Sequence, residues 1–134
     1  MDLVTTHVCM TRDIGVQGNL FGGVMMSWVD EAAAAHACLV CHTPNMVTVK
    51  VNEVIFKKKV RVGFLIKIYA EVVSIGRSSI TLGIEARKGS VYSGEEEVVL
   101  STLVTFVRLD EAGDPTPIPS PVLEKYKHLS KYNK

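Results

Sequence analysis

Net charge is almost absent from this 134-residue sequence, in which 15 lysines and arginines are balanced by 14 aspartates and glutamates to leave +1 at pH 7. Proteins that bind the nucleic acid backbone usually carry a strongly basic surface, so this balance disfavours nucleic acid as a partner. A run suited to spanning a membrane is also lacking, because Asp30, Glu31 and His36 interrupt the most apolar stretch, residues 20–40. We therefore expect a globular protein that has neither nucleic acid nor a membrane as its partner.

Cysteine is scarce, and the opening residues do not resemble a secretion signal. Three cysteines, an odd number, do not form a complete disulfide framework. The first ten residues, MDLVTTHVCM, lack the basic flank and apolar core of a signal peptide. Both absences predict a cytoplasmic protein, because free thiols are typical of a reducing compartment.

Several well-known chemical fingerprints are missing as well. The sequence contains no G-x-S-x-G nucleophile motif, no Walker loop and no dinucleotide-binding motif. CLVCH at residues 38–42 matches the C-x-x-C-H pattern of covalent haem attachment. That chemistry needs a secreted context, and the first cysteine falls inside a predicted helix, so we expect no haem and no metal.

One long helix is predicted from Gly22 or Gly23 to about Val40. The segment contains methionine, alanine and glutamate, which favour helix formation, and it contains no proline. Four consecutive alanines, residues 32–35, remove bulk and let the helix approach other backbone closely. A β-rich segment at residues 3–10 and a glycine-containing loop at 11–19 precede it, and Pro44 follows its end.

Alternating apolar and polar residues predict four strands after the helix. The alternation covers residues 47–51, 60–72 and 80–86, and a last strand at 98–109 is apolar on both faces, which suggests a central position. The remaining residues contain four of the five prolines. One helix cannot cover both faces of such a sheet, so we expect an α+β fold in which the sheet curls around the helix and a second copy of the chain completes the burial.

The predicted helix start is the first candidate for chemistry. Gly22 and Gly23 let backbone approach a ligand closely, and the first N–H groups of a helix have no partner within the helix. Such donors suit a carbonyl oxygen that gains negative charge during acyl transfer. The alternative is that the two glycines only form a tight turn.

Asp30 is the second candidate. On a helix it shares a stripe with Met26, Ser27, Ala33 and Ala34, of which only Ser27 is polar, so it is better placed than Glu31 to face an interior or interface cleft. There it could act as a general base on water or attack as a nucleophile. The alternative is that both carboxylates lie on a solvated helix face. His36 lies on another face, where a structural role fits better than catalysis.

Two further segments suit an anionic ligand. GRSS at 76–79 joins two predicted strands and offers an arginine and two hydroxyl groups. FKKKVR at 56–61 places four positive charges within six residues. Both could also be solvated strand ends.

Taken together, these residues resemble the short, single-domain bacterial acyl-CoA thioester hydrolases of the hotdog fold over residues 4–118. The resemblance is carried by Gly18, by the Phe21-Gly22-Gly23 triplet, by Met-Ser-x-x-Asp ending at Asp30 and by the alanine-rich helix. VTVKVNEVIF, GRSSI and TFVRLDEAGDPTPIP are further matches. Residues 1–118 would form the hotdog hydrolase domain, a long central helix wrapped by a curved sheet of about five strands, and residues 119–134 a C-terminal tail.

The resemblance implies an acyl-CoA thioesterase whose site lies between two subunits of a homodimer or of a hexamer built as a trimer of dimers. It implies Asp30 as the catalytic residue and the backbone of Gly22 and Gly23 as donors to the thioester carbonyl. CoA would run past Arg77, Ser78 and Ser79, and it is part of the substrate, so no cofactor is implied.

Three departures from the family pattern stand out. The family commonly has asparagine where this chain has Gly15, and Gln17 and Asn19 are the polar residues that could take over its role in positioning the thioester or the water. Lys59 replaces a common proline, and Gly63-Phe64 replaces a common Gly-Asp. A non-catalytic acyl-CoA-binding protein is therefore the alternative function, and a hotdog dehydratase is disfavoured because no histidine is paired with a carboxylate near the helix.

Overall fold

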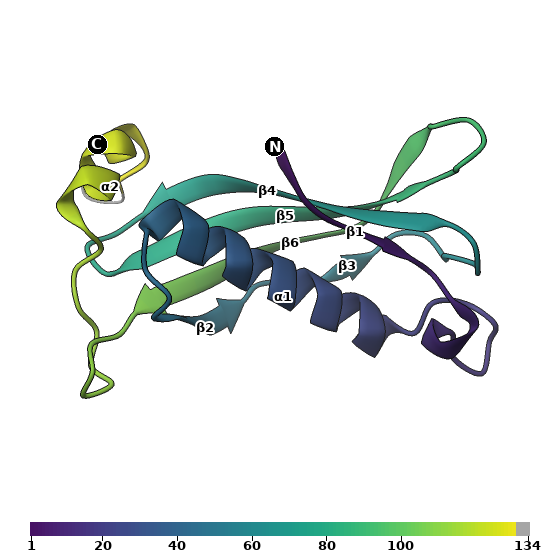
Figure 1. Cartoon of the computed structure of the whole chain (residues 1–134), viewed down its shortest axis with the longest axis horizontal. Helices are drawn as coiled ribbons and strands as arrows, with labels where there is room; N and C mark the ends of the chain where they lie inside the picture. The colour runs from purple at the N-terminus through teal and green to yellow at the C-terminus, as the bar shows by residue number, and fades with distance from the viewer. Residues whose placement is uncertain (131–134) are drawn as a thin grey trace.

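One long helix lies across a face of an antiparallel sheet in the computed structural model, which describes residues 1–130 (Figure 1). The strand order is β1–β4–β5–β6–β2, and the two-residue strand β3 pairs with β6 beside β2. A short 3-10 turn separates β1 from α1, and a short helix and a second 3-10 turn follow β6. The elements are β1 (Asp2–Val8), η1 (Thr11–Asp13), α1 (Gly22–Cys41), β2 (Met46–Val51), β3 (Ile55–Phe56), β4 (Leu65–Ile75), β5 (Ser79–Gly89), β6 (Glu96–Arg108), α2 (Ser120–Lys125) and η2 (Lys127–Leu129).

Helix α1 begins and ends where the sequence predicts. Val29, Ala33 and Ala37 are completely buried along its inner side, and the small alanines let the helix lie close to the sheet. His42 ends it in a left-handed conformation, with φ of 54°, and donates its backbone N–H to the carbonyl of Cys38. By length and composition α1 could cross a membrane, but its buried side chains belong to the core that it shares with the sheet.

Strands β4 and β5 form where the alternation predicts them, although residues 80–84 of β5 are all buried. Ile66, Ile68 and Ala70 of β4 are buried toward α1, and a bulge between Val72 and Ser74 then shifts the pattern, so that Ile75 is the next buried side chain. The bulge explains why the even-numbered pattern read from the sequence stops at Val72. Strand β6 lies between β5 and β2, which confirms its predicted central position.

Two expectations about the strands are wrong. The strand predicted from residue 60 begins only at Leu65, because Gly63 has a φ of 94° and the chain turns at residues 62–63. The valines of β2 were expected to have one buried face, but every residue of β2 after Met46 is exposed in the single chain. The physical reason is that β2 is an edge strand, which α1 covers only in part.

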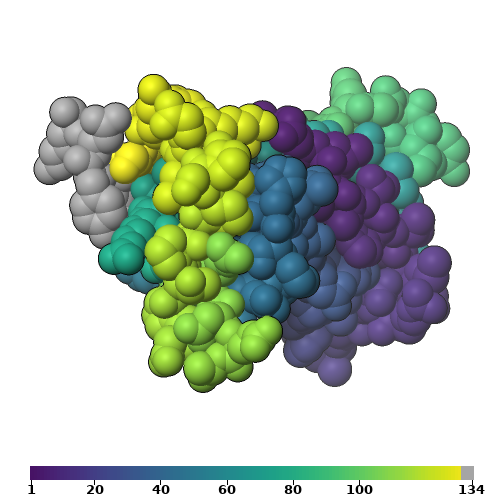
Figure 2. All heavy atoms as spheres, turned by 60° about the vertical axis from the view of Figure 1, so that its left-hand side comes forward, coloured from purple at the N-terminus to yellow at the C-terminus, as the bar shows by residue number. Residues whose placement is uncertain are grey.

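The segment after β6 is folded as far as the structure describes it. Ile118 and Val122 are buried, and Leu123 and Tyr126 pack against the core. Ser130 forms a parallel bridge with Ile75, at the end of β4. Figure 2 shows this segment in yellow beside the blue surface of α1. The predicted division between a domain and a tail at residue 118 stays a prediction, and residues 131–134 of that tail lie outside the described part.

Candidate active site

The first turn of α1 presents unpaired backbone donors. Phe21 precedes the helix with φ of −68° and ψ of 131°, and its carbonyl accepts hydrogen bonds from the N–H groups of Val24 and Met25. Gly22 and Gly23 are the first two helical residues, so their N–H groups have no acceptor within the helix. Within residues 1–130 neither N–H group donates a hydrogen bond to any acceptor outside the helix. The predicted donors are therefore available to a ligand.

Two aromatic rings flank these glycines. A Cβ atom on Gly23 would lie 2.7 Å from Cε2 of Phe21, and one on Gly22 would lie 3.5 Å from Cζ of Phe56. Both rings are more than half exposed in the single chain, at 58% for Phe21 and 53% for Phe56. The donors thus lie between two apolar surfaces, and Gly23 could not carry a side chain without moving the Phe21 ring.

Asp30 lies on the exposed side of α1, facing the edge strand. The hydroxyl group of Thr48, on β2, donates a hydrogen bond of 3.0 Å to Oδ1 of Asp30. Eight residues separate Asp30 from Gly22, which is about 12 Å along the helix axis. The carboxylate therefore does not adjoin the glycine donors of its own chain. The helix stripe allowed Asp30 either an interior or an interface position. Within one chain Asp30 is exposed, so it is not interior, and its position at an interface stays a prediction.

Glu31 faces a different part of the molecule. On that side, next to β1, the rings of His7 and Trp28 are stacked with centroids 4.4 Å apart. Burial lowers the pKa of His7, and the nearby charges of Glu31 and Asp13 oppose that shift only in part. His36 is buried, and burial lowers the pKa of its ring as well, which fits the structural role predicted for it.

Gln17 and Asn19 lie in the loop just before the helix. Asn19 braces this loop, because its side-chain amide donates to the carbonyl of Gln17 at 3.4 Å and its own carbonyl accepts the N–H of Gly15 at 2.9 Å. Gln17 is exposed. A Cβ atom on Gly15 would lie 3.3 Å from the ring of Phe21, so the residue at this position is next to the candidate donors.

The turn that contains Arg77, Ser78 and Ser79 lies at the other end of the helix. The carbonyl of Ser78 accepts the N–H of Arg108, and Arg108 pairs with Met46, which follows the C-terminal end of α1. Figure 1 shows the β4–β5 turn at that end, away from the first turn of α1. One chain therefore does not bring the predicted CoA-binding turn to Gly22 and Gly23.

The C-x-x-C-H segment occupies the end of α1. Cys41 is buried, and burial raises the pKa of its thiol to about 11, which keeps it protonated at neutral pH. Cys38 is half-buried, and all three cysteines are free thiols. Among the described residues, no group of three or more histidine, cysteine, aspartate or glutamate side chains is placed to hold a metal ion.

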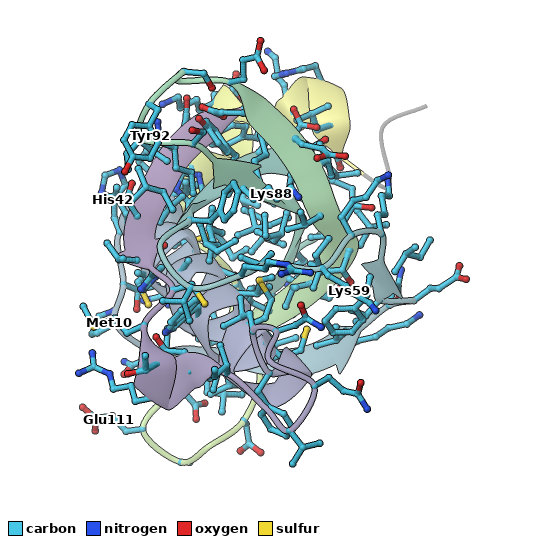
Figure 3. The ribbon with its side chains drawn as sticks, turned by 90° about the vertical axis from the view of Figure 1, so that its right-hand side faces the viewer. Met10, His42, Lys59, Lys88, Tyr92 and Glu111 are labelled. Atoms are coloured by element: carbon cyan, nitrogen blue, oxygen red, sulfur yellow. The ribbon has the colours of Figure 1, made fainter. Side chains whose placement is uncertain are left out.

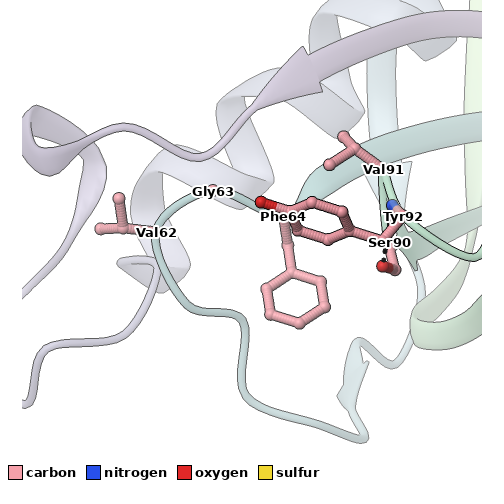
Figure 4. Close-up of a pocket in the computed structure, with 6 residues that line it drawn as sticks. All are labelled: Val62, Gly63, Phe64, Ser90, Val91 and Tyr92. Carbon is pink, nitrogen blue, oxygen red and sulfur yellow. Dashed lines mark hydrogen bonds between the residues drawn. The ribbon is translucent and has the colours of Figure 1, made fainter.

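A shallow hollow of about 230 Å³ lies between residues 62–64 and 90–92 (Figure 4). Three other hollows, of about 340, 480 and 350 Å³, lie elsewhere on the surface. None of these four is lined by Asp30, Gly22 or Gly23, and all are open to solvent. We do not assign the chemistry to any of them, because the candidate donors and the carboxylate lie outside.

Sequence reasoning did not identify two residues of this region. Phe56 is in a strand of two residues, too short to leave a periodic pattern. Thr48 alternates with valines, a pattern that indicates a strand but not that its hydroxyl meets a helix residue 18 positions earlier.

Comparison with known proteins places the chain among thioesterases. The model of the thioesterase superfamily matches residues 17–94. The acyl-CoA thioester hydrolase YciA of Salmonella typhimurium is 33% identical over 121 residues, which cover 88% of this chain and 90% of that protein.

Solved structures give the same result. An aspartate-to-alanine variant of HI0827, described as a hexameric broad-specificity acyl-coenzyme A thioesterase, is 32% identical and superimposes with a TM-score of 0.87 over 96% of both chains. An acyl-CoA hydrolase from Staphylococcus aureus, solved with butyryl coenzyme A and coenzyme A, is 27% identical with a TM-score of 0.80 over 86% of this chain and 70% of that one. A hexameric hotdog fold thioesterase of Campylobacter jejuni is 31% identical with a TM-score of 0.82 over 95% of this chain and 97% of that one, which confirms the expected hotdog fold.

Proposed function

The chain belongs to the thioesterase superfamily, and we propose that it is an acyl-CoA thioester hydrolase, which cleaves acyl-CoA with water to a free acid and CoA. The observation that carries this function is that the backbone N–H groups of Gly22 and Gly23 have no acceptor among the described residues. They lie on the same helix as the exposed carboxylate of Asp30. The similarity to acyl-CoA thioester hydrolases over most of the chain supports the substrate class.

The glycine donors act on the thioester carbonyl. When an oxygen nucleophile adds to the carbonyl carbon, negative charge builds on the carbonyl oxygen, and fixed N–H donors stabilise that charge. The exposed rings of Phe21 and Phe56 lie beside Gly22 and Gly23 and provide an apolar surface for the thioester next to these donors. The C–S bond then breaks, and CoA leaves as a thiolate that is protonated to the thiol.

Asp30 supplies or activates the nucleophile. As a general base it takes a proton from water, and the resulting hydroxide adds to the carbonyl carbon. As a nucleophile its carboxylate adds directly, which expels CoA and forms a mixed anhydride that water hydrolyses. Incorporation of oxygen-18 from water into Asp30 during a single turnover distinguishes the second route from the first.

The site is completed by a second protomer. Asp30 is about 12 Å along the helix from its own glycine donors, too far for both to act on one thioester. The exposed valines of β2 leave an apolar edge beside Asp30 that a second copy can cover. Similar thioesterases are described as hexameric, and we assign this chain a homodimeric unit within such an assembly. The turn at residues 77–79 then reaches the site from a different protomer than the glycines do.

The reaction in this form needs no cofactor, because water, the carboxylate and backbone donors supply every step. We also assign the protein to the cytoplasm. The support is the odd number of cysteines, all of them free thiols in the structure.

The Asp30→Asn variant tests the function. We expect kcat for acyl-CoA to fall about a hundredfold or more, because the amide can neither take a proton nor attack, while the fold stays intact. Thiol release from acyl-CoA esters of two to eighteen carbons, followed with a thiol reagent, measures the loss and the chain-length preference. Glu31→Gln, the neighbouring carboxylate on another helix face, is the matched control and should keep its turnover.

Two results would count against this assignment. Near-normal turnover in Asp30→Asn would remove Asp30 from the mechanism. Thermal stabilisation of the wild-type protein by acyl-CoA without thiol release would instead support the non-catalytic binding function, which the glycine at position 15 leaves open.

A further inference from the structure

We propose that the basic segment, residues 57–61, binds the phosphate groups of CoA and belongs to the same protomer as the glycine donors that bind the thioester. This inference rests on the proposed function, because it assigns a second part of the same substrate. The four cations concerned are Lys57, Lys58, Lys59 and Arg61.

The basic segment is fixed next to the helix start. Phe56, which precedes it, touches Gly22, since a Cβ atom there would lie 3.5 Å from the Phe56 ring. On one side the N–H of Lys57 donates to the carbonyl of Val99 at 2.7 Å, and on the other the N–H of Leu20 donates to the carbonyl of Val60 at 2.7 Å. The segment is thus held by β6 and by the loop that leads into α1, rather than being a free loop.

Part of the charge of the segment is already paired. Lys58 lies 3.7 Å from Glu97, and the same carboxylate lies 3.6 Å from Lys88 of β5. The ammonium group of Lys88 also donates to the backbone carbonyl of Lys59 at 3.4 Å. Figure 3, viewed toward this end of the molecule, labels Lys59 and Lys88. The Glu97 carboxylate therefore faces two lysines, Lys58 and Lys88.

Lys57, Lys59 and Arg61 are the remaining cations of the basic segment. All three are exposed, and within residues 1–130 none of them has an ion-pair partner. Exposed cations are often simply solvated, but here three of them follow directly after a residue that touches the candidate thioester donors. A ligand with several negative charges near the helix start would be attracted to this surface.

The chemistry of CoA matches this arrangement. The thioester is at one end of the long pantetheine arm, and the diphosphate and the 3′-phosphate are at the other. A protomer that holds the carbonyl at Gly22 must therefore place its cations some distance away, and the five Cα-to-Cα steps from Phe56 to Arg61 can span at most about 17 Å. Arg61 can bind a phosphate through two parallel N–H groups, and the lysines act as point charges.

The turn at residues 77–79 is the competing phosphate site. In one chain it lies at the opposite end of α1, so it can reach the same substrate only from another protomer. The two sites predict different effects when each is mutated separately, which makes them distinguishable by experiment.

The test is binding of CoA to the wild-type protein and to a triple variant, Lys57→Gln, Lys59→Gln and Arg61→Gln, by isothermal titration calorimetry. We expect the Kd for CoA to rise about tenfold or more, because several charge-assisted contacts to phosphate are lost together. The Kd for pantetheine, which has no phosphate, should not change. The wild-type Kd for CoA should also rise with salt, and more steeply than that of the triple variant. Lys125→Gln on α2, far from this surface, is the control for loss of a positive charge elsewhere, and thermal melting checks the fold.

Three outcomes would overturn the inference: an unchanged Kd for CoA in the triple variant, an equal loss for CoA and pantetheine, or a loss confined to Arg77→Ala. Because the measurement is of binding, it stands apart from the proposed function. A wild-type protein that binds CoA through the basic segment but releases no thiol would retain this inference and reject the hydrolase.

Discussion

Asp30 is held at the edge of the molecule by a single contact from another element. The Thr48 hydroxyl donates to one carboxylate oxygen at 3.0 Å, which fixes the rotamer of a side chain that is otherwise exposed. An oriented carboxylate loses less freedom when it meets water or a thioester, so this contact favours the productive geometry. Thr48 is thus a positioning residue and does not itself touch the reacting atoms.

The variant Thr48→Val keeps the shape of the side chain and removes the donor. We expect kcat to fall about threefold to tenfold with KM unchanged, because substrate binding does not use this hydroxyl. Thr48→Ser, which retains the donor, should restore most of the loss. Steady-state kinetics of both variants measures the effect, and a valine variant with wild-type kcat would show that Asp30 needs no such support.

The candidate residues were predictable from the sequence to different degrees. Asp30, Gly22 and Gly23 were recognisable because glycines and a carboxylate on an apolar helix are unusual and fit an acyl-transfer site. Thr48 and Phe56 were not, because their importance comes from contacts between segments far apart in the chain. The exposure of Asp30 in one chain was also not predictable, since a helical stripe does not tell whether the neighbour is the same chain or another.

At the scale of elements, the first turn of α1 joins three segments at one point. The Phe21 ring lies against Gly23 and near Gly15, and Phe56 of β3 lies against Gly22. The turn is therefore shaped by rings from two sides, and the two glycines differ in how much space surrounds them. This difference provides a matched pair of substitutions.

The pair is Gly23→Ala and Gly22→Ala. In Gly23→Ala the methyl group would lie 2.7 Å from Cε2 of Phe21, so the exposed ring must move. We expect kcat/KM to fall about tenfold or more, with little loss of stability, because the displaced ring changes the surface beside the donors where the thioester carbonyl must bind. Gly22→Ala meets Phe56 at an ordinary contact distance of 3.5 Å and should lose less activity.

Thiol-release kinetics together with thermal melting would separate these effects. A larger loss of activity in Gly22→Ala than in Gly23→Ala would contradict the assigned role of the Phe21 ring. A large fall in melting temperature for Gly23→Ala would show that the ring is held rigidly, and that the glycine serves folding more than chemistry.

The elements themselves were largely predictable, and the errors have physical causes. Period-two alternation identified β4 and β5, and an apolar run on both faces identified β6. The same alternation continues through residues 60–64, where Val60 is buried outside any strand. The predicted strand therefore began five residues before β4 does. In β2 the alternation identified a strand, but a bulge between Thr48 and Lys50 interrupts it, and every residue after Met46 is exposed in one chain.

At the scale of the whole molecule, the groups predicted to act on one thioester are spread along α1. The glycine donors and the basic segment lie at its start, Asp30 lies part of the way along it, and the turn at residues 77–79 lies beyond its end. A single chain therefore presents parts of a site rather than a complete one. In the proposed assembly through the exposed edge β2, a second Asp30 comes to the same region, so turnover and assembly should be lost together.

Val49→Lys tests this coupling. Val49 is 55% exposed on β2, so a lysine there costs the isolated chain little, but it would place a desolvated charge in an interface between two β2 edges. We expect smaller species in light scattering coupled to size-exclusion chromatography, and a loss of kcat that follows the fraction of dissociated protein. Leu3→Lys, at 51% exposure on the opposite edge strand β1, is the matched control and should keep both assembly and activity. A Val49→Lys protein that is monomeric and fully active would mean that Asp30 and the glycine donors of one chain suffice, and the two-protomer site would have to be abandoned.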